Sequence, residues 1–389
     1  NGPAGPGRRV SFDRPFAGFP GSEKFLCGIG TEFEDTLDKG HISDGLEAVL
    51  AEQGVTLSRY RFVQIERAGR KWHIFDAGII ATLQREADAI RIYDGFSTWE
   101  SCWHHWEQHF VAWAERSGYQ IDYAVNSDLE FRPEILKDYR LVLSIGHDEY
   151  WSSPMRDHLE AFISNGGNAA FFSGNCLFWQ VRSEDDGRAL VCWKEEYERD
   201  PIYQTGNRRH LSTLWCHHLV DRPENHLTGV SFAFGGYHGF FDQYQDGPGC
   251  YTIHRPEHWI FEGTRVKRGD RLGCRNKIVN YECDGCEFCV ENGLPEPTHR
   301  DGTPETFRIL ATAPAGLTDA DGSLEMASEA VYGPKSGKHL RQPGAAVLGI
   351  YERGGTVVTA GSTDWVFGLK GGDTAVEQIT RNILERLSK

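Results

Sequence analysis

The sequence predicts an α/β protein whose core is a flavodoxin-like parallel sheet carrying a β-rich insertion. Two observations lead to this fold class. Residues 104–182 show in turn the patterns of helix, strand, helix, strand, helix and strand, an alternation typical of parallel sheets covered by helices. Residues 190–345 instead scatter aromatic residues, Gly and Pro at short intervals, which is typical of β-rich structure. A strand at 356–360 and an amphipathic helix at 376–387 then return to the first pattern and should close the core.

A strand, a helix and a second strand form the best-defined unit. Residues 141–145 and 169–172 are short apolar runs, typical of strands that are buried on both faces. Between them, Ser153 can cap a helix that has Pro154 in its first turn, and Gly166 can end it. Two strands joined by such a helix run parallel through a right-handed connection. The sequence therefore predicts a βαβ unit here.

Ionisable residues follow both of these strands. His147, Asp148, Glu149 and Tyr150 come directly after the first strand, and Ser-Gly-Asn-Cys at 173–176 follows the second. Open α/β sheets bind ligands at the carboxyl ends of their strands. The two acids have a structural alternative, because they can stabilise the positive end of the next helix. Since His, carboxylate and phenolate groups are common metal ligands, we expect at least one of the four to be functional.

The remaining elements are weaker predictions. We expect helices or helical turns at 46–50, 79–87, 104–117 and 128–136. We expect further strands at 60–66, 72–75, 121–125, 227–234, 252–260, 277–281, 307–312 and 346–351. The expected domain organisation is an extended segment at 1–24, an insertion at 25–100, an α/β core at 101–189, a β-rich region at 190–345, and closing strands and helix of the core at 346–389.

Composition limits the classes of function. The chain has 389 residues, is 39% hydrophobic and contains no apolar stretch long enough to span a membrane. Its net charge of −15 argues against non-specific binding of nucleic acids, which needs a basic surface. Ten Cys residues are too sparse and irregularly spaced for a disulfide framework, so we expect reduced thiols and a cytoplasmic location.

Several cysteines have alternative interpretations. Cys176 lies at a tight turn after a strand, as nucleophilic cysteines do, but its spacing is not Gly-x-Cys-x-Gly and a buried structural thiol is favoured. Cys283, Cys286 and Cys289 have a spacing that suggests zinc or an iron–sulfur cluster. Because side chains alternate between the faces of a strand, three such thiols would not converge in a strand, and structural thiols are again favoured.

Several motifs occur together and in a fixed order. They are Gly146-His-Asp-Glu-Tyr-Trp-Ser152, Gly166-Gly-Asn-Ala-Ala-Phe-Phe-Ser-Gly-Asn175, Trp179-Gln-Val-Arg182, Arg222-Pro-Glu-Asn225, Asp284-Gly-Cys-Glu287, Asp301-Gly-Thr-Pro304 and Ala360-Gly-Ser-Thr-Asp-Trp365. This series resembles the C-terminal region of the large, beta subunit of N,N-dimethylformamidase. The resemblance covers about residues 100–389 together with Val-Ser-Phe-Asp-Arg-Pro at 10–15. It implies a glutamine-amidotransferase-like core with β-rich additions.

The resemblance also implies an amidohydrolase with a mononuclear ferric iron bound by two tyrosinates and a glutamate. Tyr150 matches the family's Tyr at the end of the His-x-Glu-Tyr motif. Where the second Tyr is expected this chain has His109, which makes ferrous iron or zinc the alternative metal. Glu224 is a candidate carboxylate ligand on its chemistry alone. Glu352 resembles the family's catalytic Glu, and His147 is the second candidate catalytic residue.

The expected function is hydrolysis of the C–N bond of an amide or formamide, with metal-bound water as nucleophile and Glu352 as general base. A metal-free hydrolase or amidotransferase that uses Cys176 is the second hypothesis. A non-catalytic binding subunit on the same scaffold is the third. The expected partners are a small amide substrate and either a small subunit or further copies of the chain.

Overall fold

The computed structural model describes residues 9–11, 55–57, 62–67, 70–75, 103–239, 248–319 and 322–389. The chain divides into two compact units, one of residues 1–7 and 13–105 and the other of residues 8–12 and 106–389. In the first unit, β2 (Val55–Leu57), β3 (Phe62–Arg67) and β4 (Arg70–Phe75) form an antiparallel sheet close to two of the predicted strands. The helices predicted at 46–50 and 79–87 lie outside the described residues.

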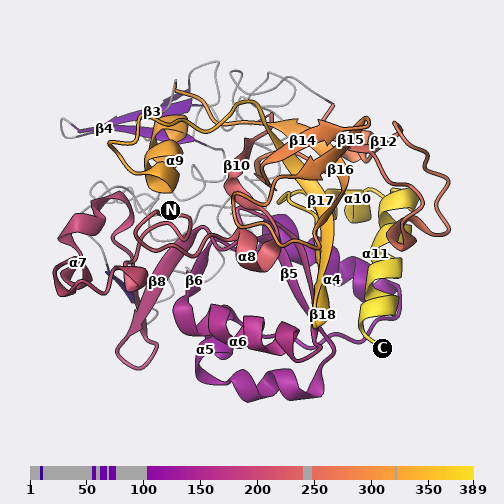
Figure 1. Ribbon diagram of the computed structural model, residues 1–389, viewed down its shortest axis with the longest axis horizontal. Helices are drawn as coiled ribbons and strands as arrows, with labels where there is room; N and C mark the ends of the chain where they lie inside the picture. The colour runs from indigo at the N-terminus through magenta and orange to yellow at the C-terminus, as the bar shows by residue number, and fades with distance from the viewer. Residues whose placement is uncertain are drawn as a thin grey trace. The chain divides into compact units, whose positions relative to one another are not determined.

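A seven-stranded mixed sheet forms the centre of the second unit (Figure 1). In spatial order its strands are β12 (Arg271–Leu272), β11 (Tyr251–Ile253), β16 (Arg308–Ala315), β17 (Gly344–Arg353), β18 (Gly355–Thr359), β7 (Asn168–Gly174) and β5 (Leu141–His147). The pairs β18–β7 and β7–β5 are parallel, and the other pairs are antiparallel. The α/β class is confirmed, but the sheet is mixed rather than parallel throughout.

The predicted βαβ unit is confirmed as β5, helix α6 (Ser153–Ser164) and β7. The helix is capped by Ser152 rather than by Ser153. The hydroxyl of Ser152 accepts a hydrogen bond from the backbone N–H of Met155 at 3.3 Å, and Pro154 lies in the first turn as expected. This bond satisfies one of the N–H groups that have no partner within the helix.

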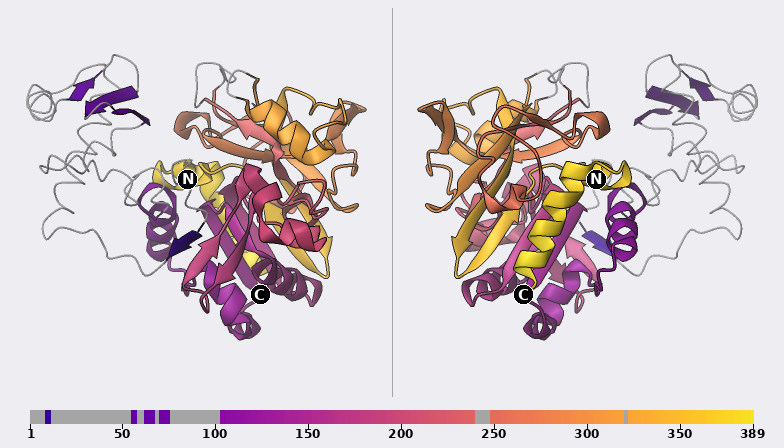
Figure 2. Two further views of the ribbon diagram at one scale, coloured as in Figure 1. Left: turned by 90° about the vertical axis from the view of Figure 1, so that its left-hand side faces the viewer. Right: turned by 90° about the vertical axis from the view of Figure 1, so that its right-hand side faces the viewer.

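Helices cover both faces of the parallel part of the sheet (Figure 2). Phe171 of β7 belongs to the same buried cluster as Leu159 of α6. The next residue, Phe172, has its ring 5.7 Å from Phe110 of α4 (Gln108–Arg116) and 5.8 Å from Trp365 of α10 (Trp365–Lys370). Because successive residues of a strand point to opposite faces, α6 covers one face and α4 with α10 covers the other.

The closing helix is confirmed as α11 (Thr374–Leu387), which packs with α10 and β7 (Figure 2). Asp373 caps it by accepting hydrogen bonds from the N–H groups of Ala375 and Val376 at 3.0 and 3.1 Å. Its buried residues recur at helical spacing and include Ile379 and Ile383, so one face packs inward.

The remaining elements form smaller sheets and short helices. One sheet has the order β1 (Arg9–Ser11), β9 (Ala189–Val191), β8 (Trp179–Glu184) and β6 (Tyr150–Ser152). The antiparallel pairs are β10 (Ser231–Tyr237) with β13 (Glu282–Gly285), and β14 (Phe288–Glu291) with β15 (Leu294–Pro297). The other α-helices are α5 (Asn126–Phe131), α7 (Pro201–Thr205), α8 (Asn225–Thr228) and α9 (Ser323–Tyr332). A π-helical turn, Trp103–Glu107, precedes α4. Across the described part of the chain, every helix is too short or too polar to span a membrane.

Two predicted strands are wrong, and two others are wrong in part. The strand predicted at 252–260 ends at Ile253, and the strand predicted at 227–234 begins only at Ser231. Residues 121–125 contain no regular structure, and Tyr123 and Val125 are 59% and 63% exposed. No face of this segment is buried, so its apolar residues do not stabilise a strand. Residues 277–281 form a loop that ends at Tyr281, and the strand begins one residue later at Glu282.

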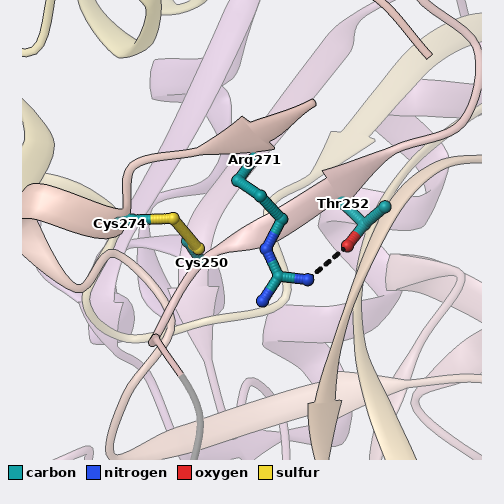
Figure 3. Close-up of a disulfide and its surroundings, with 4 residues drawn as sticks. All are labelled: Cys250, Thr252, Arg271 and Cys274. Atoms are coloured by element: carbon teal, nitrogen blue, oxygen red, sulfur yellow. Dashed lines mark hydrogen bonds between the residues drawn. A yellow bond between two sulfur atoms is a disulfide. The ribbon is translucent and has the colours of Figure 1, made fainter. Parts of the chain in front are cut away.

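The expectation that all thiols are reduced is also wrong. Cys250 and Cys274 form a disulfide that links the start of β11 to the turn after β12 (Figure 3). These strands pair antiparallel, with Tyr251 opposite Leu272, which brings the two cysteines together. Sparse cysteines therefore do not argue against a single disulfide, because a strand pairing supplies the proximity.

We predict that replacing both Cys250 and Cys274 by Ser lowers the free energy of unfolding by about 2–4 kcal/mol, because the disulfide closes a loop in the unfolded chain. Denaturant unfolding measures this change. The matched control is Cys289→Ser, which removes an exposed free thiol and should leave the unfolding midpoint nearly unchanged. Equal midpoints for the double variant and the unmodified protein would contradict the prediction.

Candidate functional site

Two strands bring ionisable side chains to the carboxyl edge of β5 and β7. His147 is the last residue of β5, and Glu149 follows it just before β6. Strand β13 begins with Glu282 and crosses the end of β7, where Gly174 lies so close that a Cβ atom would be 2.3 Å from the carbonyl oxygen of Glu282. Only a residue without a side chain permits this approach of two backbones. One imidazole and two carboxylates therefore meet at this edge.

A second glycine positions the aromatic support of the site. Gly146 has a φ of +79°, and a Cβ atom there would lie 2.4 Å from the Cβ of Trp106. The buried ring of Trp106 stacks beside His147, with ring centroids 5.6 Å apart. Its Nε1 donates a hydrogen bond of 2.8 Å to the buried carboxylate of Asp364. The indole thus fixes the imidazole on one side.

His147 lies between two buried carboxylates. Its Nε2 is in direct contact with Glu282 and is 4.0 Å from Oε2 of Glu149. Other side chains fix both acids: Asn175 donates to Glu282 at 3.2 Å, and Nε1 of Trp179 donates to Glu149 at 2.8 Å. Each carboxylate is therefore oriented by a neutral donor while it faces the imidazole.

Burial raises the pKa values of the acids in this region. It raises the pKa of Asp284 to about 7 and that of Asp364 to about 6. It also raises the pKa of Glu149, against the opposing effect of the nearby His147. With pKa values near neutrality, Asp284 and Asp364 can donate and accept protons at physiological pH, and such groups are concentrated at active sites.

Asp284 holds the turn that carries Cys176. Its two carboxylate oxygens accept hydrogen bonds from the backbone N–H groups of Asn175 and Cys176, at 2.9 and 3.1 Å. Cys176 is buried, and burial together with Asp148 and Asp284 raises the pKa of its thiol well above the usual value. A thiol in this environment stays protonated and is a poor nucleophile.

Tyrosines complete the site. The ring of Tyr281 lies 6.0 Å from that of His147, and the hydroxyl of Tyr150 accepts a hydrogen bond of 2.9 Å from the ammonium of Lys194. Burial raises the pKa of both phenols well above the usual value, with further contributions from the adjacent Glu282 and Glu149. His147 and Tyr150, both predicted from the sequence, thus lie in one site.

Two other predicted residues have different neighbours. The ring of His109 is tilted against that of Phe367 of α10, with ring centroids 5.9 Å apart, and burial and Lys370 lower the pKa of His109 to about 4. Glu224 is buried near Arg156, and burial raises its pKa to about 8. The structure does not bring these two residues together with Tyr150.

Glu352 lies at the opposite edge of the sheet. It pairs with Thr356 of β18, and the next residue of β18, Val357, pairs with Ala169 near the start of β7. β7 runs parallel to β5, so Glu352 is level with the beginning of β5 rather than with His147 at its end. The six residue steps of β5 from its start to His147 span roughly 20 Å, which is about the distance between Glu352 and the site along the strand direction. Glu352 is exposed and does not contribute to this site.

The predicted set of metal ligands does not fit a metal centre in this arrangement. Tyr150, His109 and Glu224 have separate surroundings, as described above. In the part of the chain that the structure describes, no group of three or more His, Cys, Asp or Glu side chains is arranged to hold a metal ion. Cys283 and Cys286 are buried free thiols and Cys289 is exposed, so these three do not form a shared site. The iron, or zinc, stays a prediction from the resemblance.

Sequence reasoning missed Glu282, Tyr281 and Lys194. Glu282 reaches His147 only because β13 crosses the end of β7, a long-range contact that no local pattern records. The strand predicted at 277–281 ends one residue before Glu282, so the predicted strand does not include this acid. The local sequence signal for Glu282 is that this acid follows the short apolar run at 278–279.

Comparison with known proteins identifies relatives of the chain. The family model described as "N,N-dimethylformamidase beta subunit-like, C-terminal" matches residues 4–378. Curated N,N-dimethylformamidase beta subunits from Paracoccus aminophilus and from an Alcaligenes species are each 23% identical over 306 residues. These alignments cover 72% of this chain and 36% of each relative, so the chain spans about a third of their length.

A solved structure is also similar in part. The crystal structure of a putative ThuA-like protein from Bacteroides uniformis is 10% identical, with a TM-score of 0.33. The match covers 72% of this chain and 82% of that chain.

We predict that Gly146→Ala destabilises the protein by about 2–4 kcal/mol, because the added methyl group combines an unfavourable φ with a clash against Trp106. Gly118→Ala is the matched control: its φ is +82°, but nothing lies within 4 Å of the added Cβ, so about 1 kcal/mol is expected. Denaturant unfolding of both variants separates backbone strain from the clash. Equal losses would show that contact with Trp106 is unimportant.

Proposed function

The chain belongs to the N,N-dimethylformamidase beta subunit-like, C-terminal family, and on this premise we propose that it hydrolyses the C–N bond of a linear amide or formamide. The observation that carries the proposal is the buried contact between His147 and Glu282 at the carboxyl edge of β5. An imidazole paired with a carboxylate is a common acid–base device in hydrolases. N,N-dimethylformamide is the substrate to test first, because the relatives are named for it.

The proposed mechanism uses His147 and Glu282 as one acid–base unit. The pair takes a proton from water as the water oxygen bonds to the carbonyl carbon. It then returns that proton to the amine nitrogen as the C–N bond breaks, so that the products are a carboxylic acid and an amine. Asn175 holds the Glu282 carboxylate, and Trp106 holds the imidazole plane, so the pair stays oriented through both steps.

Other predicted residues have no step in this proposal. Glu352, at the far edge of the sheet, and His109 and Glu224, with their separate surroundings, are left out of the mechanism. A ferric iron would supply Lewis acidity for the carbonyl, and zinc would supply the same. The predicted ligands do not assemble, so the proposed mechanism assigns its proton transfers to side chains alone.

The proposal extends to partners and fold. The relatives are named as a subunit, and this chain spans about a third of their length, which supports a partner subunit or further segments in the complete enzyme. The unit of β5, α6, β7 and β18 supports a flavodoxin- or glutamine-amidotransferase-like core. The cytoplasmic location stays a prediction.

We predict that Glu282→Gln lowers kcat/KM for amide hydrolysis by about 10²–10⁴-fold, because the imidazole loses its charged partner. Release of amine from N,N-dimethylformamide measures the rate. Glu352→Gln is the control, since it makes the same chemical change at an exposed residue outside the site, and it should leave kcat/KM unchanged. A large loss with Glu352→Gln and none with Glu282→Gln would move the site to the other edge of the sheet.

Cys176→Ala should retain most of the activity, because the buried thiol packs at the turn that Asp284 holds and stays protonated. The same assay measures it, with circular dichroism to check folding. Complete loss of activity in a folded variant would favour the alternative hydrolase that uses Cys176 as nucleophile.

A further inference from the structure

Lys194 has a strained backbone next to the site. Its φ is +53°, in the left-handed region that side chains other than Gly rarely occupy. Such a conformation costs of order 1 kcal/mol and persists only where the surroundings hold it. Strained residues are concentrated at functional sites, so this conformation suggests that the Lys194 side chain has a function.

A buried polar network holds this backbone. The N–H groups of Trp193 and Lys194 both donate to the carbonyl oxygen of Ser212, at 2.9 and 3.0 Å. Asp200 in turn accepts hydrogen bonds of 3.1 Å from the N–H and the hydroxyl of Ser212, and forms an ion pair of 2.7 Å with Arg182. Ser212 and Asp200 are completely buried. The network therefore fixes the backbone of Lys194, from which its side chain extends toward Tyr150.

The side chain reaches the site over two aromatic rings. The ammonium nitrogen lies 4.9 Å from the centroid of Trp179 and 5.3 Å from that of Tyr150. It is 2.9 Å from the hydroxyl oxygen of Tyr150. Trp179 is the residue that donates to Glu149, and Tyr150 hydrogen-bonds to Glu149 as well. Lys194 therefore contacts both side chains that orient this carboxylate.

The chemistry of the three groups sets the direction of the hydrogen bonds. An ammonium has donors and no acceptor, whereas a carboxylate has acceptors and no donor. A phenol between them must accept a hydrogen bond from the lysine and donate its one hydrogen bond to the carboxylate. We propose that Lys194 is a positioning residue of the site, and that Lys194, Tyr150 and Glu149 form a hydrogen-bond chain in which the phenol of Tyr150 accepts from Lys194 and donates to Glu149.

This chain disagrees with the role that the resemblance implies for Tyr150. A phenolate bound to iron would have given up the proton through which Tyr150 donates a hydrogen bond to Glu149 in this chain. Tyr150 then orients Glu149 toward His147 and does not bind a metal.

The first experiment does not depend on turnover. The full chain, with any partner that purifies with it, is titrated with ferric iron, and its visible spectrum is compared with that of Tyr150→Phe. We expect the two spectra and the amounts of bound iron to agree. A visible band in the unmodified protein that disappears in Tyr150→Phe would show an iron–phenolate bond and overturn the proposal.

The second experiment rests on the proposed function. Lys194→Met should lower kcat for N,N-dimethylformamide by about 10–100-fold, as expected for loss of a charge-assisted hydrogen bond, with little change in KM. Lys194→Arg should restore part of the rate, because a cation is again present. Lys338→Met is the matched control: it removes an exposed lysine that lies 5.7 Å from the Tyr332 ring and should leave kcat unchanged.

The outcomes separate the two proposals. Equal kcat values for Lys194→Met and the unmodified protein would overturn the positioning role. No turnover by any form of the protein would count against the proposed function, while the iron titration would still decide the role of Tyr150.

Discussion

The rest of this site depends on one constraint: several carboxyl groups are buried around the imidazole of His147. Among the residues that the structure describes, the buried carboxyl groups in this region are those of Glu149, Glu282, Asp284 and Asp364. An ionised carboxylate without partners in a protein interior costs several kcal/mol, so each group must be protonated or hydrogen-bonded. The donors include the indoles of Trp106 and Trp179, the amide of Asn175 and the backbone N–H groups of Asn175 and Cys176. The surrounding fold supplies these donors, and their number explains why so many aromatic and polar residues converge here.

Close backbone approach makes this convergence geometrically feasible. Gly174 lets β13 cross the end of β7, and Gly146 lets Trp106 lie beside His147. Both glycines lie at the carboxyl end of a parallel strand, where a βαβ unit leaves room for a site. The contact of Gly174 with Glu282 and that of Gly146 with Trp106 leave no space for a larger residue at either position.

Local signals were sufficient for the parts of the fold that depend on neighbouring residues. The apolar runs and the capped helix predicted β5, α6 and β7, and the position of His147 and Tyr150 after a strand predicted their place at its carboxyl edge. Glu282 could not be predicted, because its contact with His147 depends on the crossing of two strands that are distant in sequence. Glu352 was assigned from a short motif alone, and β17 runs antiparallel to its neighbour, which puts its end at the other edge. The disulfide of Cys250 depends on a strand pairing in the same way.

The central claim is that His147 and Glu282 act as one acid–base unit. A double-mutant cycle on kcat/KM tests it directly, using His147→Gln, Glu282→Gln and the double variant with N,N-dimethylformamide as substrate. Residues that act as a unit have strongly non-additive effects, so the double variant should be no slower than the slower single variant. If the two losses instead multiply in the double variant, the residues act independently, and the contact between them is not the source of the catalysis.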